Sequence, residues 1–253
     1  MEIETTERKR STRSALWRGQ VFMFDKPIDA GWRPDQGLRL LAIFAFLEFA
    51  FRPLLGTLAK SFGFNHQIWW QLASQIIFLG TAILVTLVFA KVNLAQIGLR
   101  PWKSWSATEK HYFVQTLIIT IDIFATLNFA GLKSIWLGGK IAQNALFLFL
   151  PQMVWGFYQE FLYRGLLQGE LVRRWGPVRG ILASNLVFTF GPLHFYNFEL
   201  AARHHEYPWI FAGIFTIGLY FSILYHRSGN LWIIGILHGL GDFFVDGLRR
   251  ILK

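Results

Sequence analysis

Long apolar stretches recur along the whole chain, and they constrain its fold more than any other feature of the sequence. An α-helix of about 20 apolar residues is long enough to cross the hydrocarbon core of a bilayer. Seven such stretches are present, at residues 38–58, 68–90, 112–131, 141–167, 180–197, 209–226 and 230–248. This pattern predicts an all-α, polytopic membrane protein.

Composition agrees with a membrane protein. The 253 residues are 53% hydrophobic and only 16% charged, and the mean hydropathy is +0.37. Soluble domains carry about 25% charged residues. The basic C-terminal end, Arg249, Arg250 and Lys253, breaks the alternation of loop charge that seven spans produce. An eighth segment, short or re-entrant, would restore that alternation, so we expect seven or eight transmembrane helices.

The net charge of +10 comes from loops and tails. Lys and Arg concentrate in residues 1–36, in the loop after the second span and in the loop after the fourth. Under the positive-inside rule this distribution places the N-terminus in the cytoplasm. It also favours the lipid bilayer over nucleic acid as the partner of these basic residues. The first apolar stretch begins too late for a cleavable signal peptide. We therefore predict a basic cytoplasmic tail at 1–36 and an integral membrane domain at 37–253.

The fourth span carries ionisable residues, which are costly inside a bilayer and normally face protein or a wet cavity. Glu160 and Arg164 are four residues apart and share one helix face with Gln152 and Gly156. Gln159 lies about 100° around the helix from Glu160. A structural ion pair is the plain alternative to a functional role.

Two later spans also contain polar residues. In the fifth, Gly191-Pro192 interrupts the helix just before His194. In the seventh, His238 and Asp242 are four apart and share a face. An interfacial histidine and a polar packing pair are the respective alternatives. Together the three sets predict a polar cavity between the later helices.

Two other polar features of the spans have simpler interpretations. Glu48 and Arg52, four apart on the first span, are expected to form a structural ion pair. Asp122 lies in the middle of the third span without a local partner and is a candidate to line a polar cavity.

Several known hydrolytic motifs are absent. The one His-Glu step, at 205–206, has Trp209 where a zincin would have its second histidine. No GxSxG element occurs, and the absence of cysteine excludes a thiolate nucleophile. The GLGD stretch ending at Asp242 spells the presenilin-type GxGD. That chemistry needs a second aspartate, and Asp122 lacks the expected sequence context.

Taken in order, three motifs resemble the CAAX protease and bacteriocin-processing (CPBP) family. They are QEFLYR (159–164), FGPLH (190–194) and HGLGD (238–242). The IGLRPW stretch (97–102) fits more weakly. The resemblance implies an intramembrane endopeptidase in which a glutamate and the first histidine activate a water molecule. It also implies that the second histidine and the Asn or Asp stabilise the oxyanion.

The chain departs from this family at one position. The family signature begins Glu-Glu, and its first glutamate is the usual base, whereas this chain has Gln159 there. An amide cannot accept the proton. We expect Glu160 to take over as base after a rotation of the helix or a rearrangement of the pocket. The expected catalytic set is Glu160, His194, His238 and Asp242, supported by Gln159 and Arg164.

Two other functions stay open. One is a catalytically inactive relative that binds a membrane peptide, and the other is a membrane transporter with broken helices. No cofactor is expected, although Glu160, His194, His238 and Asp242 form an alternative N/O ligand set for zinc. The expected partners are the bilayer and a peptide or protein substrate presented at it. The expected location is a bacterial cytoplasmic membrane.

Overall fold

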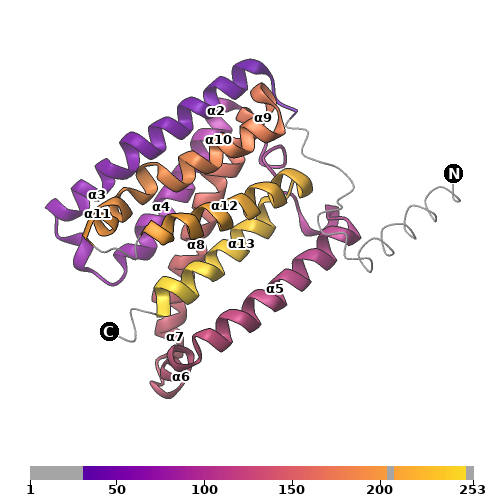
Figure 1. Ribbon diagram of the computed structural model, residues 1–253. Helices are drawn as coiled ribbons and strands as arrows, with labels where there is room; N and C mark the ends of the chain where they lie inside the picture. The colour runs from indigo at the N-terminus through magenta and orange to yellow at the C-terminus, as the bar shows by residue number, and fades with distance from the viewer. Residues whose placement is uncertain (1–30, 204–207, 249–253) are drawn as a thin grey trace, which may run out of the picture.

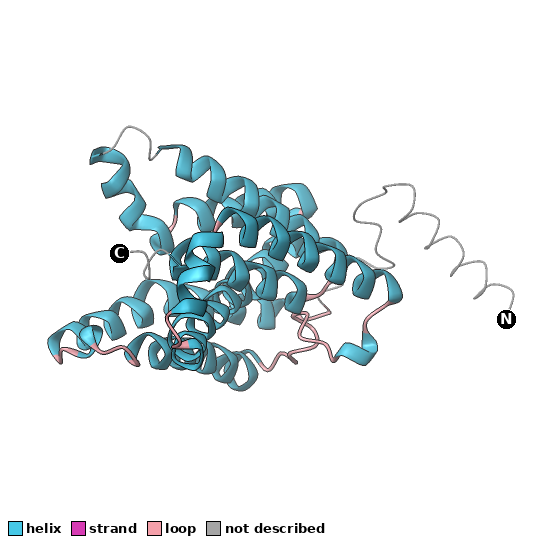
Figure 2. Cartoon of the chain, turned by 90° about the horizontal axis from the view of Figure 1, so that it is seen from below, coloured by secondary structure: helices cyan, strands magenta, loops and turns pink. Residues whose placement is uncertain are grey.

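The computed structural model describes residues 31–203 and 208–248, and within those ranges every regular element is a helix (Figure 2). The all-α prediction is confirmed for this part of the chain. Most of the predicted tail 1–36 lies outside it.

Helices occupy each of the seven predicted stretches. The first half contains α2 (Pro34–Phe46), α3 (Arg52–Ser61), α4 (Trp70–Val85), α5 (Ala107–Leu127), α6 (Phe129–Leu137) and α7 (Ile141–Asn144). The second half contains α8 (Leu150–Glu160), α9 (Gly169–Trp175), α10 (Pro177–Phe190), α11 (Phe195–Arg203), α12 (Pro208–Ser228) and α13 (Leu231–Asp242). Wider π-helical turns continue several of them, at Leu47–Phe51, Thr86–Ala90, Ala145–Phe149, Phe161–Gln168 and Phe243–Gly247.

The number of membrane crossings is only partly supported. In the described residues, two helices are long and apolar enough to span a bilayer, Trp70–Ala90 and Trp209–Ser228. A third qualifies if α5 and α6, which meet at 81°, form one bent span. The prediction of seven or eight spans is therefore not confirmed. Large apolar side chains such as Ile118, Leu127 and Phe129 are nevertheless exposed. Exposure on this scale is typical of a membrane-facing surface.

Helix α8 lies at the centre of the bundle (Figure 1). It packs against α13 and α4, while α10 packs against α9 and α12. Helices α2 and α3 run along one edge in Figure 1, and α5 lies on the opposite side, against α13. This order brings the fourth, fifth and seventh apolar stretches together.

Glycines bring α8 and α13 into close contact. A Cβ atom on Gly156 would collide with the backbone of Gly239. A Cβ atom on Gly239 would lie 2.7 Å from the Cα of Met153. Gly235 likewise accommodates the ring of Phe157. Small residues commonly allow membrane helices to approach in this way, so polar side chains on α8 reach α13 directly.

A buried carboxylate connects α9 to the segment before α2. Glu170 accepts a hydrogen bond from the Trp32 indole at 2.9 Å, and its oxygens also accept from Arg173 and Arg174. Burial alone would raise the pKa of Glu170, but these donors lower it below the ordinary glutamate value. Gly37 leaves room for this carboxylate, because a Cβ atom there would collide with it.

Candidate active site

Glu160 lies at the end of α8, where it joins its own helix to α13. Its Oε1 atom is 2.6 Å from His238 Nδ1, and its Oε2 atom is 3.3 Å from Arg164 Nε. A carboxylate only accepts, so His238 Nδ1 carries the proton and donates. The Glu160 side chain is 0% exposed. The predicted pairing of Glu160 with Arg164 is present, and His238 is an additional partner.

Arg164 is fully buried and lies between three helices. Its Nη2 donates to the Gly218 carbonyl of α12 at 2.8 Å. Its guanidinium carbon lies 4.3 Å from the ring centre of Phe188 on α10, a cation–π geometry. The π-helical turns of Phe161–Gln168 begin directly after Glu160, and such turns are frequent at functional sites.

His194 owes its orientation to Pro192. The carbonyl of Phe188 would normally accept from the backbone N–H four residues later, but residue 192 is a proline and has none. His194 Nδ1 lies 2.7 Å from that carbonyl oxygen and donates to it instead. In the neutral ring this bond leaves the lone pair on Nε2. The proline interruption noted in the sequence thus selects one tautomer of His194.

Asp242 lies one turn beyond His238 at the end of α13. Its Oδ2 atom accepts from Gln159 Nε2 at 3.2 Å, and its Oδ1 atom is 3.6 Å from His238 Nε2. Gln159 and Glu160 therefore both reach α13, one through Asp242 and the other through His238. The glycine contact between α8 and α13 brings the two helices close enough for both adjacent residues to reach α13.

Phe188 is a central residue that sequence reasoning missed. Its ring packs edge-on against His194, His238 and Tyr163, with centroid distances of 5.1, 5.9 and 5.2 Å. It also lies under Arg164. The FxxxH spacing in the sequence contains a phenylalanine at 190, but the residue that touches both imidazoles is two positions earlier.

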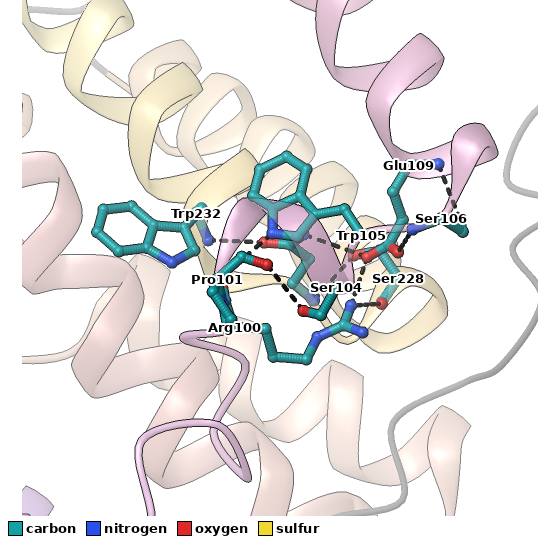
Figure 3. Close-up of polar contacts among 9 residues, drawn as sticks. Arg100, Pro101, Ser104, Trp105, Ser106, Glu109, Ser228 and Trp232 are labelled. Atoms are coloured by element: carbon teal, nitrogen blue, oxygen red, sulfur yellow. Dashed lines mark hydrogen bonds and ion pairs between the residues drawn. The ribbon is translucent and has the colours of Figure 1, made fainter.

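The loop before α5 and the first turn of α5 contact the N-terminal end of α13. Glu109, on the first turn of α5, pairs with Arg100 and accepts from Asn230 Nδ2 at 3.1 Å. Arg100 Nη2 donates to the carbonyl of Ser228 at 3.1 Å. Figure 3 shows Arg100, Glu109 and Ser228 gathered beside Trp105. The weak IGLRPW resemblance thus falls on a segment that contacts the α12–α13 turn.

The two remaining polar features of the spans take separate positions. Glu48 and Arg52 form the predicted ion pair at 2.7 Å, with the glutamate buried. Asp122 is exposed on α5. The partners of Asp242 on α8 and α13 are Gln159 and His238, so the presenilin-type pair of aspartates gains no support.

The alternative zinc site gains no support from this geometry. In the part of the chain that the structure describes, no group of three or more His, Cys, Asp or Glu side chains is arranged to hold a metal ion. His238 Nδ1 and Glu160 Oε1 are hydrogen-bonded to each other, so these two atoms are not open to a metal ion in this arrangement. No catalytic step is therefore assigned to a metal.

Comparison with known proteins bears on this arrangement. Residues 141–244 match the family described as type II CAAX prenyl endopeptidase Rce1-like. This segment runs from α7 to the turns after α13 and contains all three motifs. Searches of curated proteins and of solved structures found no match.

Proposed function

We propose that the protein is an intramembrane endopeptidase, because residues 141–244 match the Rce1-like type II CAAX prenyl endopeptidase family. It hydrolyses a peptide bond in a peptide or protein tail presented at the membrane. The observation that carries this proposal is the hydrogen bond from His194 Nδ1 to the Phe188 carbonyl. In the neutral ring this bond leaves the lone pair on Nε2, which can accept a hydrogen bond from water. We propose that it resides in a bacterial cytoplasmic membrane, with its N-terminus on the cytoplasmic side, because the N-terminal residues are basic.

The side chains divide the work of hydrolysis among them. His194 Nε2 accepts a hydrogen bond from the attacking water and orients its oxygen toward the scissile carbonyl carbon. His238 lies between the carboxylates of Glu160 and Asp242 and acts as the imidazolium, which carries an N–H on both ring nitrogens. Its Nδ1–H donates to Glu160, and its Nε2–H, on the opposite ring edge, stabilises the developing oxyanion. A carboxylate takes the proton of the water and returns it to the departing amine. Arg164 balances the charge of Glu160.

Peptide cleavage tests this function directly. We expect purified protein in lipid vesicles to cleave peptides from a membrane-derived library, read by mass spectrometry. His194→Ala should lower the rate at least about 100-fold, the usual contribution of a positioned proton-transfer or water-orienting group. The matched control is His111→Ala, because His111 is exposed on α5 and bonds only its own helix at Ala107. Equal rates for wild type and His194→Ala would contradict the proposal.

A silent wild type that still binds these peptides would favour the inactive alternative instead. Substrate flux across vesicles without any cleavage product would favour a transporter.

Pro192→Ala is expected to lower the cleavage rate about tenfold, the value of one net hydrogen bond of roughly 1.4 kcal/mol. The alanine N–H can occupy the Phe188 carbonyl, and His194 then loses the bond that selects its tautomer. Nitrogen NMR of labelled histidine would show a mixed population of the two tautomers. Pro177→Ala is the control, since Pro177 stands at the start of α10, where no carbonyl depends on it. An unchanged tautomer and rate for Pro192→Ala would show that proline is not required.

A further inference from the structure

We propose that Asp242, and not Glu160, is the general base of this enzyme, and that Gln159 is the residue that positions it. This inference rests on the proposed peptidase function and assigns the proton transfer within it. It replaces our expectation from the sequence that Glu160 takes over the role of the missing glutamate.

Glu160 is poorly placed to meet water. Its side chain is 0% exposed, and each oxygen has a charged or proton-donating neighbour. The Oε1 atom accepts from His238 at 2.6 Å, and the Oε2 atom faces Arg164 at 3.3 Å. To accept a proton from water, Glu160 would have to release one of these partners, and a buried charge would lose its compensation. Glu160 is therefore an orienting carboxylate for His238, in the manner of the aspartate in a catalytic triad.

Asp242 has the access that Glu160 lacks. Its side chain is 20% exposed, and the neighbouring His238 side chain is 12% exposed. Of the two carboxylates next to His238, Asp242 is the one with a partly exposed side chain, and its Oδ1 atom can meet an incoming water molecule without breaking a hydrogen bond. Its Oδ1 atom is 3.6 Å from His238 Nε2, a separation that leaves a lone pair available. The carboxylate of Asp242 thus lies beside His238 Nε2, the atom to which we assign stabilisation of the oxyanion.

Gln159 fixes the orientation of this base. Its Nε2 donates to Asp242 Oδ2 at 3.2 Å, so the other oxygen of the carboxylate remains free to take the proton. The amide of Gln159 on α8 and the carboxylate of Asp242 on α13 are therefore in contact between the two helices. In the family signature the acid of this pair stands at the α8 position. This chain has the amide there and an acid on α13.

These side chains account for every proton and bond in the reaction. As the water oxygen bonds to the carbonyl carbon, its proton moves to Asp242 Oδ1, and the carbonyl π electrons pass to oxygen. His238 Nε2–H stabilises that oxyanion. When the oxyanion collapses, the C–N bond breaks and Asp242 returns the proton to the leaving nitrogen. The products are a carboxylic acid and an amine, and Asp242 is again a carboxylate.

The decisive experiment moves the carboxylate from one helix to the other. Cleavage rates are measured in vesicles for wild type, Asp242→Asn and the double variant Gln159→Glu with Asp242→Asn. Asp242→Asn should lower the rate at least about 100-fold, since an amide cannot take the proton. The double variant should cleave at least about tenfold faster than Asp242→Asn, because it again has a carboxylate in the Gln159–Asp242 contact. A merely structural role for Asp242 would give no such recovery.

Three outcomes separate this inference from the proposed function. Full activity of Asp242→Asn, with His194→Ala inactive, would overturn the assignment of the base and leave the peptidase intact. No recovery in the double variant, with thermal unfolding in detergent unchanged, would also overturn it. A wild type that never cleaves while the double variant does would overturn both, and would identify the natural chain as an inactive relative.

Discussion

Gly156→Ala is expected to destabilise the protein by about 1–3 kcal/mol, the usual cost of overpacking a filled interior, and to remove most of its cleavage activity. The added methyl group would meet the backbone of Gly239, and backbone cannot rotate away as a side chain can. Helices α8 and α13 must therefore separate. The Gln159–Asp242 and Glu160–His238 contacts both cross this gap, so both would lengthen together.

Gly241→Ala is the matched control for this prediction. Gly241 lies on α13, two residues from Gly239, but a Cβ atom there would meet nothing within 4 Å. The same substitution should be neutral, or stabilising by about 0.5–1 kcal/mol through helix propensity. The measurements are thermal unfolding in detergent and cleavage of one library-derived peptide. Equal behaviour of the two variants would show that the close approach of α8 and α13 is not required.

Arg164→Met should have the second large effect, a destabilisation of about 3–5 kcal/mol. The methionine fills part of the same volume, but the buried carboxylate of Glu160 loses its ion pair with a permanently charged guanidinium. The carbonyl of Gly218 loses its contact with the guanidinium as well. The most direct measurement is the shift of the unfolding transition in detergent, compared with wild type at the same lipid and protein concentrations.

The double variant Arg164→Met with Glu160→Gln separates charge from packing. Because it leaves no unpaired charge, it should recover a large part of the stability that Arg164→Met loses. Cleavage should stay impaired, since an amide orients His238 less strongly than a carboxylate. If the double variant is as unstable as the single one, the contribution of Arg164 lies in packing against Phe188 and Gly218 and not in its charge.

Local pattern predicted much of this molecule. The apolar stretches predicted helices at all seven positions, and the i,i+4 spacings predicted that Glu160 pairs with Arg164 and Glu48 with Arg52. Pro192 marked the break beside His194. These features follow from helix geometry and backbone chemistry, which act within a few residues along the chain. The number of membrane crossings did not follow as clearly, because α10 and α13 are short and carry polar groups.

The partners across helices came only from tertiary structure. Helical periodicity states which face a residue occupies, but it does not state how close the neighbouring helix lies. The contact of Gly156 with Gly239 lets the adjacent residues Gln159 and Glu160 both reach α13, where they meet Asp242 and His238. Patterns in the sequence were enough to predict an all-helical membrane protein with three ordered polar motifs. Packing decided which carboxylate is enclosed by charge partners and which one keeps access to water, because burial depends on neighbours that no local pattern encodes.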